Sequence, residues 1–477
     1  MLKREEEQRQ AVEMLCTDMI VPKDHLLRKI DKAVDFKYIY TLVEELYSPD
    51  NGRPSVDPVV LFKIVLIQHL FGIRSLRQTV KEIELNIGYR WFLGYTMSEP
   101  IPHFATVSYA FRQRFGSDIV EHVFQWILAA AGQRGCLSPE AVFIDATHVK
   151  ANANLQKKIK QAIPQAARQY QHQLREEVNQ DREKHGKKPF DDPSDDIPPQ
   201  TREVTVSKTD PESGLFHKGE HKKCFAYGVH TACEKHNFIL GVEVTAGNLH
   251  DSTVFDTLYQ KTVQRFPQVE AIVADAGYKT PWICKQVFDE GRLPVLPYKR
   301  PMTPPGYFHS YDYVYDEYYD CVLCPQNRVL VYATTNREGR REYKSNPHDC
   351  KACSVREQCT RSKTAQKTVQ RHLWEDYIDR SEDIRHSDVG KALYPLRSET
   401  IERVFADAKE KHAMRYTYYR GLDQVTKWVK LKFAAMNLKK LAMWRDYPSF
   451  LCCFFCLQTL FRSPSFRFHF KEPAFLF

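Results

Sequence analysis

The stretch AVFIDATHVKANAN, residues 141–154, places one acid, Asp145, in a run that otherwise has the pattern of a buried strand. The run from Ala141 to Ile144 is short, apolar and partly β-branched, which is typical of a strand covered on both faces. A carboxylate rarely stands in or at the end of such a strand without a purpose. We therefore interpret Asp145 as a residue that faces a functional site.

A second acid follows the same pattern in AIVADAGY, residues 271–278, where Asp275 comes after an apolar run. Gly277 behind it lets the backbone turn close to a ligand. Carboxylates at the ends of neighbouring strands can converge on a hard cation such as Mg2+, which prefers oxygen ligands. The surrounding pattern predicts the order β-β-β-α-β, with strands at 141–149, 225–233, 238–246 and 271–278 and a helix at about 252–265; a helix near 280–290 and a strand near 293–298 follow.

The third acid is expected on a helix that packs against the sheet. The apolar face of that helix has spacing i, i+3, i+4 and i+7, formed by Ile401, Val404, Phe405 and Ala408. Glu402 adjoins this face, and Lys409 lies two turns further along the same side. Glu399 is the competing acid, but no lysine follows it at the matching distance. Three acids could hold two cations for in-line phosphoryl displacement.

This arrangement resembles the ribonuclease-H-like core, and the motifs are similar to those of DDE transposases of bacterial insertion sequences. The relevant group has the signature Tyr-x2-Arg-x3-Glu-x6-Lys. Glu402 and Lys409 match it, whereas Tyr394-x2-Arg397 is followed by four residues rather than three. GRPSVDPVVLFK and HFATVSYAFRQRF resemble an InsH-like N-terminal domain, and GNLHDS also resembles the family. The resemblance covers most of residues 20–445.

The resemblance implies cleavage of DNA at the ends of a mobile element, followed by joining of the 3′-hydroxyl ends to target DNA. It implies Asp145, Asp275 and Glu402 as catalytic ligands of two Mg2+ ions, for which Mn2+ substitutes. Lys409, Arg397 and Tyr394 would bind phosphate. The expected partners are the terminal inverted repeats, target DNA and further copies of this chain, as a homodimer or larger oligomer. Two alternatives stay open: a ribonuclease-H-like metal-dependent nuclease, and an inactive zinc-containing DNA-binding protein derived from a transposase.

The cysteines predict a second metal site. Cys321-x2-Cys324 and Cys350-x2-Cys353 are two knuckles at a separation typical of structural zinc, with Cys359 a possible substitute. The intervening VLVYATTNREGRREYKS predicts a hairpin that bends at Arg-Glu-Gly, as in a zinc ribbon. Free thiols in a tyrosine-rich subdomain are the alternative.

Basic and aromatic residues alternate after the third acid, where Arg415, Tyr416, Tyr418, Tyr419 and Arg420 lie within six positions. This pattern suits phosphate contact and base stacking, although a solvated helix face would explain it too.

Near the N-terminus, helices are predicted to begin at Asp57-Pro58 and at Ser75 and to meet near Gly72. This helix-turn-helix-like pair carries the basic residues Arg74, Arg77, Lys81 and Arg90. They would contact DNA, or the helix pair would serve only packing or dimerisation.

The two histidines beside the acids have simpler interpretations. His148 is expected to be a structural residue, and His250 with Asp251 is expected to cap the helix that follows rather than to bind metal.

The whole chain of 477 residues carries a formal net charge of +9, a modest excess that suits a polyanionic partner. We expect neither a signal peptide nor a membrane span, and hence a cytoplasmic, nucleoid-associated protein.

The expected fold is α/β, with a ribonuclease-H-like mixed sheet flanked by helices, an all-α N-terminal domain and a zinc-ribbon-like insertion. The expected divisions are a helical DNA-binding or dimerisation domain at 1–135, the first catalytic part at 136–300 with a charged, solvated insertion at about 156–205, the cysteine-rich insertion at 301–375, the catalytic helix and basic stretch at 376–446, and an apolar tail at 447–477.

Overall fold

The computed structural model describes residues 14–48, 55–164, 170–191, 201–218, 222–300 and 302–444. The expected apolar tail, from residue 447, lies outside these residues. No helix within the described ranges is long and apolar enough to cross a membrane.

The N-terminal part is helical, as predicted. Its elements are α1 (Thr17–Ile20), α2 (Leu26–Ala33), α3 (Tyr38–Val43), η1 (Glu44–Leu46), α4 (Pro58–Leu70), α5 (Leu76–Leu85), α6 (Ile87–Leu93), α7 (Phe104–Tyr109), the π-helical turn η2 (Ala110–Arg114) and α8 (Ser117–Gln133). Both predicted helix starts are confirmed, because Asp57 accepts a hydrogen bond from the Val59 amide at 2.7 Å and Ser75 accepts one from the Gln78 amide at 3.2 Å. Gly72 separates α4 from α5 and has a φ of +65°, which favours glycine.

An eight-stranded mixed sheet forms the centre of the molecule, with strand order β2-β3-β4-β5-β1-β7-β8 and β6 paired to β5. Its strands are β1 (Ala141–Lys150), β2 (Lys158–Pro164), β3 (Thr201–Ser207), β4 (Gly214–Lys218), β5 (Lys222–Cys233), β6 (Ile239–Ala246), β7 (Ala271–Ala274) and β8 (Leu293–Val295). β1, β7 and β8 are parallel, whereas β5 is antiparallel to its neighbours β1 and β6. The predicted order β-β-β-α-β therefore holds for β1, β5, β6, the helix α10 (Phe255–Arg265) and β7.

The charged stretch between β1 and β5 is more structured than predicted. β2 pairs with β3 along its whole length, and β4 joins this extension to β5. The helix α9 (Gln171–Lys184) buries Leu174 and Val178 against Trp374. The sequence shows little apolar periodicity here because only a few side chains face a partner. The acidic, proline-punctuated segment at 192–200 lies outside the described residues.

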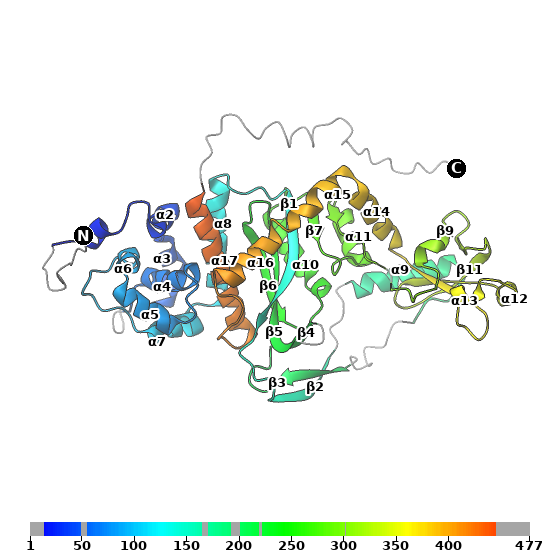
Figure 1. Ribbon diagram of the computed structural model, residues 1–477, viewed down its shortest axis with the longest axis horizontal. Coiled ribbons are helices and arrows are strands. Elements are labelled where there is room, and N and C mark those ends of the chain that lie inside the picture. The colour runs from blue at the N-terminus through cyan, green and yellow to red at the C-terminus, as the bar shows by residue number, and fades with distance from the viewer. Residues whose placement is uncertain are drawn as a thin grey trace, which may run out of the picture.

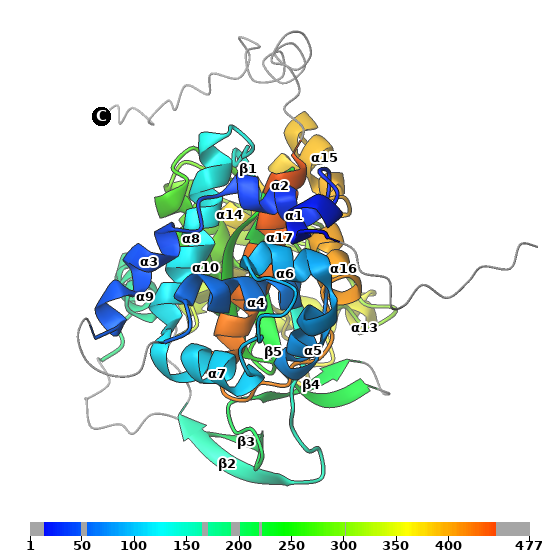
Figure 2. The same cartoon turned by 90° about the vertical axis from the view of Figure 1, so that its left-hand side faces the viewer.

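Helices cover the sheet and connect it to the N-terminal part. The long helix α17 (Leu422–Met443) packs against α2, α4 and α8 on one side and against β6 on the other. Figure 1 shows α17 between the N-terminal helices and the sheet, and Figure 2 shows those helices in front of it. One hydrophobic core runs through both parts without a break, from Leu27 in α2 to Val273 in β7. The helical part and the sheet therefore form one packed body.

The cysteine-rich insertion lies beyond β8, at the far end of the molecule from the N-terminal helices (Figure 1). Its five-stranded sheet has the order β13-β12-β11-β10-β9. The elements from α11 onwards are α11 (Pro281–Asp289), η4 (Ser310–Asp312), β9 (Val314–Asp316), β10 (Cys321–Leu323), β11 (Val329–Thr335), β12 (Arg340–Lys344), α12 (Pro347–Lys351), α13 (Arg356–Cys359), β13 (Thr368–His372), α14 (Glu375–His386), α15 (Asp388–Leu393), η5 (Tyr394–Arg397) and α16 (Ile401–Glu410). The predicted hairpin is confirmed as β11 and β12, with Gly339 at a φ of +76° in its turn.

Candidate active site

The two predicted strand acids lie next to each other on parallel strands. β1 pairs with β7 as far as Ile144 and Ala274, so Asp145 and Asp275 occupy the next position on each strand. β7 ends there, whereas β1 continues to Lys150 along β5. Asp145 thus lies in the middle of its strand, at the point where the strand loses its parallel neighbour. This opening in the sheet explains why an otherwise buried strand carries an acid.

The surroundings of Asp145 work against its negative charge. Burial raises the pKa of the Asp145 carboxyl to about 6, the Arg397 guanidinium opposes this rise, and the carboxylates of Asp275 and Asp251 add to it. Its Oδ1 accepts a hydrogen bond from the Ala146 amide at 2.7 Å. Acids that repel each other in a partly buried site are stabilised by a bound cation. The pair is therefore chemically suited to a divalent metal ion.

Arg397 is buried and holds the other oxygen of the same carboxylate. Its Nη2 donates to Asp145 Oδ2 at 2.6 Å, and its Nη1 lies 3.5 Å from the Tyr394 hydroxyl. Tyr394 and Arg397 thus contact each other despite the extra residue before Glu402, because both lie in η5. The Arg397 Nε has no hydrogen-bond partner within the described residues. A buried guanidinium with an unused donor is suited to an oxyanion.

The chain from η5 to the end of α16 follows β1. The Lys409 ammonium donates to the hydroxyl of Thr147, which shares a face of β1 with Asp145. Just after α16, Tyr416 forms a parallel bridge with Lys150. Glu402 lies exposed in the first turn of α16, between Arg397 and Lys409 in sequence, and forms no ion pair with a described residue.

Two further residues are associated with the acids: Asp251, which the sequence suggested only as a cap residue, and Tyr278, which the sequence did not single out. Asp251, in η3 (Asp251–Thr253), has a pKa raised by burial and by the charge of Asp275. Its Oδ1 lies 3.7 Å from Nδ1 of the buried His230, which pairs with Ala146 and so lies on the opposite face of the sheet from Asp145. The Tyr278 hydroxyl is buried without a hydrogen-bond partner in the described part of the chain.

Both residues stand inside motifs that were already of interest, GNLHDS and AIVADAGY. Membership of these two motifs is the one feature of the sequence that could have drawn attention to Asp251 and Tyr278. Burial and the charges of Asp251, Asp145 and Asp275 raise the pKa of Tyr278 well above its usual value.

The two histidines behave as predicted. His148 Nε2 lies 3.2 Å from the Gly247 carbonyl oxygen, and its ring stacks on Phe216 at 3.7 Å. His250 caps η3, since its Nδ1 accepts a hydrogen bond from the Ser252 amide at 3.3 Å. Asp251 lies in the first turn of η3, next to the His250 cap, and its Oδ1 also approaches His230 Nδ1 at 3.7 Å.

The predicted zinc ligands do not all come together. β10 places Val322 in the small core of the insertion, so strand alternation turns Cys321 to the opposite face. Cys324 and Cys359 both pack against that core, and Cys359 Sγ lies 3.1 Å from the Tyr313 hydroxyl. Burial raises the pKa of the Cys359 thiol, and the neighbouring Cys350 and Cys324 thiols add to this rise. Cys324 and Cys359 thus share one small core, to which Cys321 does not belong.

No group of three or more His, Cys, Asp or Glu side chains in the described ranges is arranged to hold a metal ion. The structure therefore does not show the predicted four-cysteine site, nor three converged catalytic acids. Mg2+ is commonly held by one or two carboxylates plus water and phosphate, a requirement that the neighbouring Asp145 and Asp275 fit.

Comparison with known families agrees with this geometry. Residues 15–114 match a transposase domain (DUF772), and residues 323–442 match a transposase DDE domain. The chain belongs to the DDE-type insertion-sequence transposases. The second match includes Glu402 and Lys409 of this transposase, whereas Asp145 and Asp275 precede it. No curated protein and no solved structure matches the transposase.

Proposed function

We propose that this transposase cuts DNA at the ends of a mobile insertion sequence and joins the freed 3′-hydroxyl ends to target DNA. The observation that carries the proposal is the position of Asp145 beside Asp275 where β7 ends, with the segment from Arg397 to Lys409 along the same part of β1. The strand order β6-β5-β1-β7-β8, with β5 antiparallel, supports a ribonuclease-H-like catalytic core. Such chemistry would take place on DNA in the cytoplasm, at the nucleoid.

Asp145 and Asp275 would hold divalent metal, with Glu402 as the third carboxylate. Bound Mg2+ or Mn2+ supplies positive charge to the attacking and leaving oxygens of an in-line displacement. Glu402 is exposed and forms no ion pair with the residues that the structure describes, so its carboxylate can turn toward a ligand at low cost. Its place in the first turn of α16 also puts the negative charge at the favourable end of the helix dipole.

Cations around the acids would position the DNA backbone. The Arg397 Nε has no partner among the described residues, and Lys409 contacts Thr147, two residues along β1 from Asp145, so both cations lie close to a phosphate held at the acids. Tyr394 would orient Arg397 through the contact between the hydroxyl and the guanidinium. Arg415 and Arg420 are exposed beyond α16 and would contact the flanking DNA. Assembly as a dimer or larger oligomer on two DNA ends is part of the same proposal.

For the insertion we propose a structural role for zinc, with Cys359 in place of Cys321 as the fourth ligand beside Cys324, Cys350 and Cys353. Support comes from the shared core of Cys324 and Cys359 and from the opposite orientation of Cys321. The backbone amide of Arg328 also donates to Cys324 Sγ at 3.4 Å, as expected of a thiolate ligand at a tight turn.

The experiment is cleavage and joining of labelled duplexes that carry the element's ends, in Mg2+ or in chelator. Glu402→Gln is the most informative variant, because an exposed side chain can be replaced without loss of stability. Nicked and joined products should require both metal and Glu402, and Glu399→Gln serves as the matched control. Nicks without joined products would indicate a nuclease, and DNA binding without nicks would indicate an inactive DNA-binding protein.

A further inference from the structure

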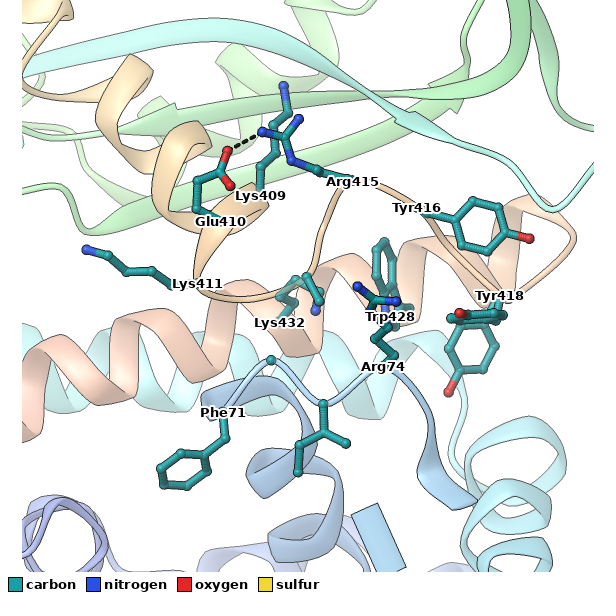
Figure 3. A pocket seen from close by; sticks show the side chains of 14 residues that line it. Phe71, Arg74, Lys409, Glu410, Lys411, Arg415, Tyr416, Tyr418, Trp428 and Lys432 are labelled. Carbon is teal, nitrogen blue, oxygen red and sulfur yellow. Dashed lines mark hydrogen bonds and ion pairs between the residues drawn. The ribbon is translucent and has the colours of Figure 1, made fainter. Parts of the chain in front are cut away.

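A groove of about 660 Å³ lies beside the proposed active site, between the N-terminal part and the catalytic part. Its walls come from the α4–α5 turn, the segment after α16, and α17. Figure 3 shows Phe71 and Arg74 on the side of the α4–α5 turn and Lys411 and Arg415 on the opposite side, where the Arg415 guanidinium is turned toward Glu410. Its volume lies within the range of roughly 300–1,000 Å³ that is typical of ligand pockets.

The two sides of the groove are fixed to each other. A Cβ on Gly72 would lie only 2.6 Å from the backbone oxygen of Lys411, so the α4–α5 turn touches the segment after α16 directly. His412 Nδ1 lies 2.7 Å from the His69 carbonyl oxygen, and the Lys432 ammonium donates to the His412 carbonyl oxygen. The groove is therefore formed before any ligand binds, which lowers the entropic cost of binding.

The charge of the groove favours an anion. Among the residues that line it, the one acid, Glu410, is outnumbered by the cations Arg74, Lys409, Lys411 and Arg415. Glu410 is paired with Arg415, and Lys411 is paired with Asp407 at 2.8 Å. Arg74 is exposed on the opposite wall. Cations on both walls would flank a polyanionic chain that passes between them.

Aromatic side chains give the groove a second property. Tyr416 and Tyr418 pack edge to face at 4.9 Å, and Tyr418 remains 54% exposed at the rim. Tyr416 is held by Asn152, whose Oδ1 accepts from the Tyr416 hydroxyl at 3.0 Å, while Asn152 Nδ2 donates to the Tyr418 carbonyl oxygen at 3.0 Å. The backbone of Tyr418 is thus fixed while its ring stays available. Cations next to an available aromatic ring are typical of sites for single-stranded nucleic acid.

The groove and the proposed active site share Lys409. Its ammonium donates to Thr147, two residues from Asp145 on the same face of β1, and its side chain also lines the groove. Two residues of a strand span about 7 Å, close to the separation of successive phosphates in an extended DNA strand. A strand with one phosphate at Asp145 would therefore pass Thr147 and the Lys409 side chain, which lines the groove.

We propose that this groove binds an unpaired nucleotide of the DNA strand that adjoins the scissile phosphate. Arg74 and Arg415 contact its phosphates from opposite walls, and its base stacks on Tyr418. This inference rests on the proposed function, because it takes the scissile phosphate to lie at Asp145. It assigns to the N-terminal part, through Arg74, a direct role at the cleaved end.

The test measures binding of the full-length protein, in chelator, to a blunt duplex and to the same duplex with a single-stranded overhang. 2-Aminopurine at the first unpaired position reports base stacking. We expect the native protein to prefer the overhang and to quench the probe. Tyr418→Ala should reduce this preference about tenfold, as for loss of one stacked base, while Tyr418→Phe retains it. Arg74→Ala should lower the affinity for the overhang, whereas Lys37→Ala, an exposed cation of the same helical part, serves as the control.

The outcomes distinguish failure of the groove proposal from failure of the proposed catalytic function. An unchanged preference for the overhang in both Tyr418→Ala and Arg74→Ala overturns the inference, as does a native protein that binds both duplexes equally. Because Arg74 lies on the wall opposite Tyr418, its variant decides the question if Tyr418→Ala fails to fold. Overhang binding that depends on these residues, in a protein that never nicks DNA with Mg2+, supports the groove and contradicts the proposed catalytic function.

Discussion

The acid pair in the central sheet and the cysteines in the insertion started from equally regular motifs, but only the acids lie where their motifs predicted. Asp145 and Asp275 each follow an apolar run, and adjacent parallel strands bring them side by side. Cys321 and Cys324 form an ordinary knuckle motif, yet β10 turns Cys321 away and Cys359 approaches Cys324 instead.

The difference lies in where the residues of each motif stand on their strands. The strand acids sit at equivalent positions on neighbouring strands, and parallel pairing keeps equivalent positions together. The cysteine knuckle straddles the end of a strand, where alternation of side chains decides which residue faces the core. A motif predicts a site reliably only when the local structure keeps its members on one face.

The largest expected effect comes from Asp145→Asn or Asp275→Asn, which should reduce nicking of end-bearing duplexes by about a thousandfold or more. The substitutions keep the size of each side chain but remove the charge that would hold metal. Asp24→Asn, at an exposed position outside the site, is the matched control. Initial rates of nicking measure the effect, and the thermal stability of the insertion should not change. Retained activity in Asp145→Asn would show that the adjacency of the acids is not catalytic.

The next largest effect is expected on zinc content and on the stability of the insertion, compared between Cys359→Ser and Cys321→Ser. We expect Cys359→Ser to lose bound zinc and to destabilise the insertion by several kcal/mol, because structural zinc contributes directly to folding. Cys321→Ser should keep its zinc, since this side chain faces away from the other cysteines. Elemental analysis of the purified proteins, with proteolysis of the insertion, measures both. Zinc loss in Cys321→Ser with zinc retained in Cys359→Ser would restore the ligand set predicted from the sequence.

A smaller effect is expected from Gly72→Ala, which acts on the contact between the N-terminal part and α16. Alanine at a φ of +65° costs about 1–2 kcal/mol, and its Cβ would also press on the Lys411 backbone. The free energy of unfolding should therefore fall by at least this amount. Gly94→Ala is the control, because its φ of +80° is similar but no atom lies within 4 Å of the added Cβ. Chemical denaturation of both variants isolates the cost of the contact.

The smallest expected effect concerns Lys432, buried at the groove, whose pKa burial lowers to about 7 from a usual 10.5. The folded protein disfavours the charged form of Lys432. Burial of this ammonium therefore lowers the free energy of unfolding by its full amount below pH 7, and this cost disappears as the pH rises toward 10.5. Lys432→Met should therefore be more stable than the native protein near pH 7, by about 1 kcal/mol after the lost bond to His412 is deducted. The two stabilities should converge with rising pH. A constant difference across this range would show that Lys432 does not titrate within it.

Much of the candidate site could be read from local sequence. The apolar runs before Asp145 and Asp275, the periodic face around Glu402 and its spacing to Lys409 all survive in the fold, because each depends on a few consecutive residues. Asp251 and Tyr278 could not be assigned in this way. Their roles depend on which strands are neighbours, and no spacing within the chain encodes that.

The sequence by itself determined the order β1, β5, β6, α10 and β7 of the core elements, the helix starts at Asp57 and Ser75, and the family to which the chain belongs. Only the tertiary structure decided that Arg397 pairs with Asp145, that Cys321 faces away from Cys359, and that Arg74 and Arg415 line one groove. The physical reason is the range of the forces. Capping and periodicity act over one or two turns, whereas these contacts join residues far apart in the chain, and the packing of α16 and α17 on the sheet and the N-terminal helices brings the groove together.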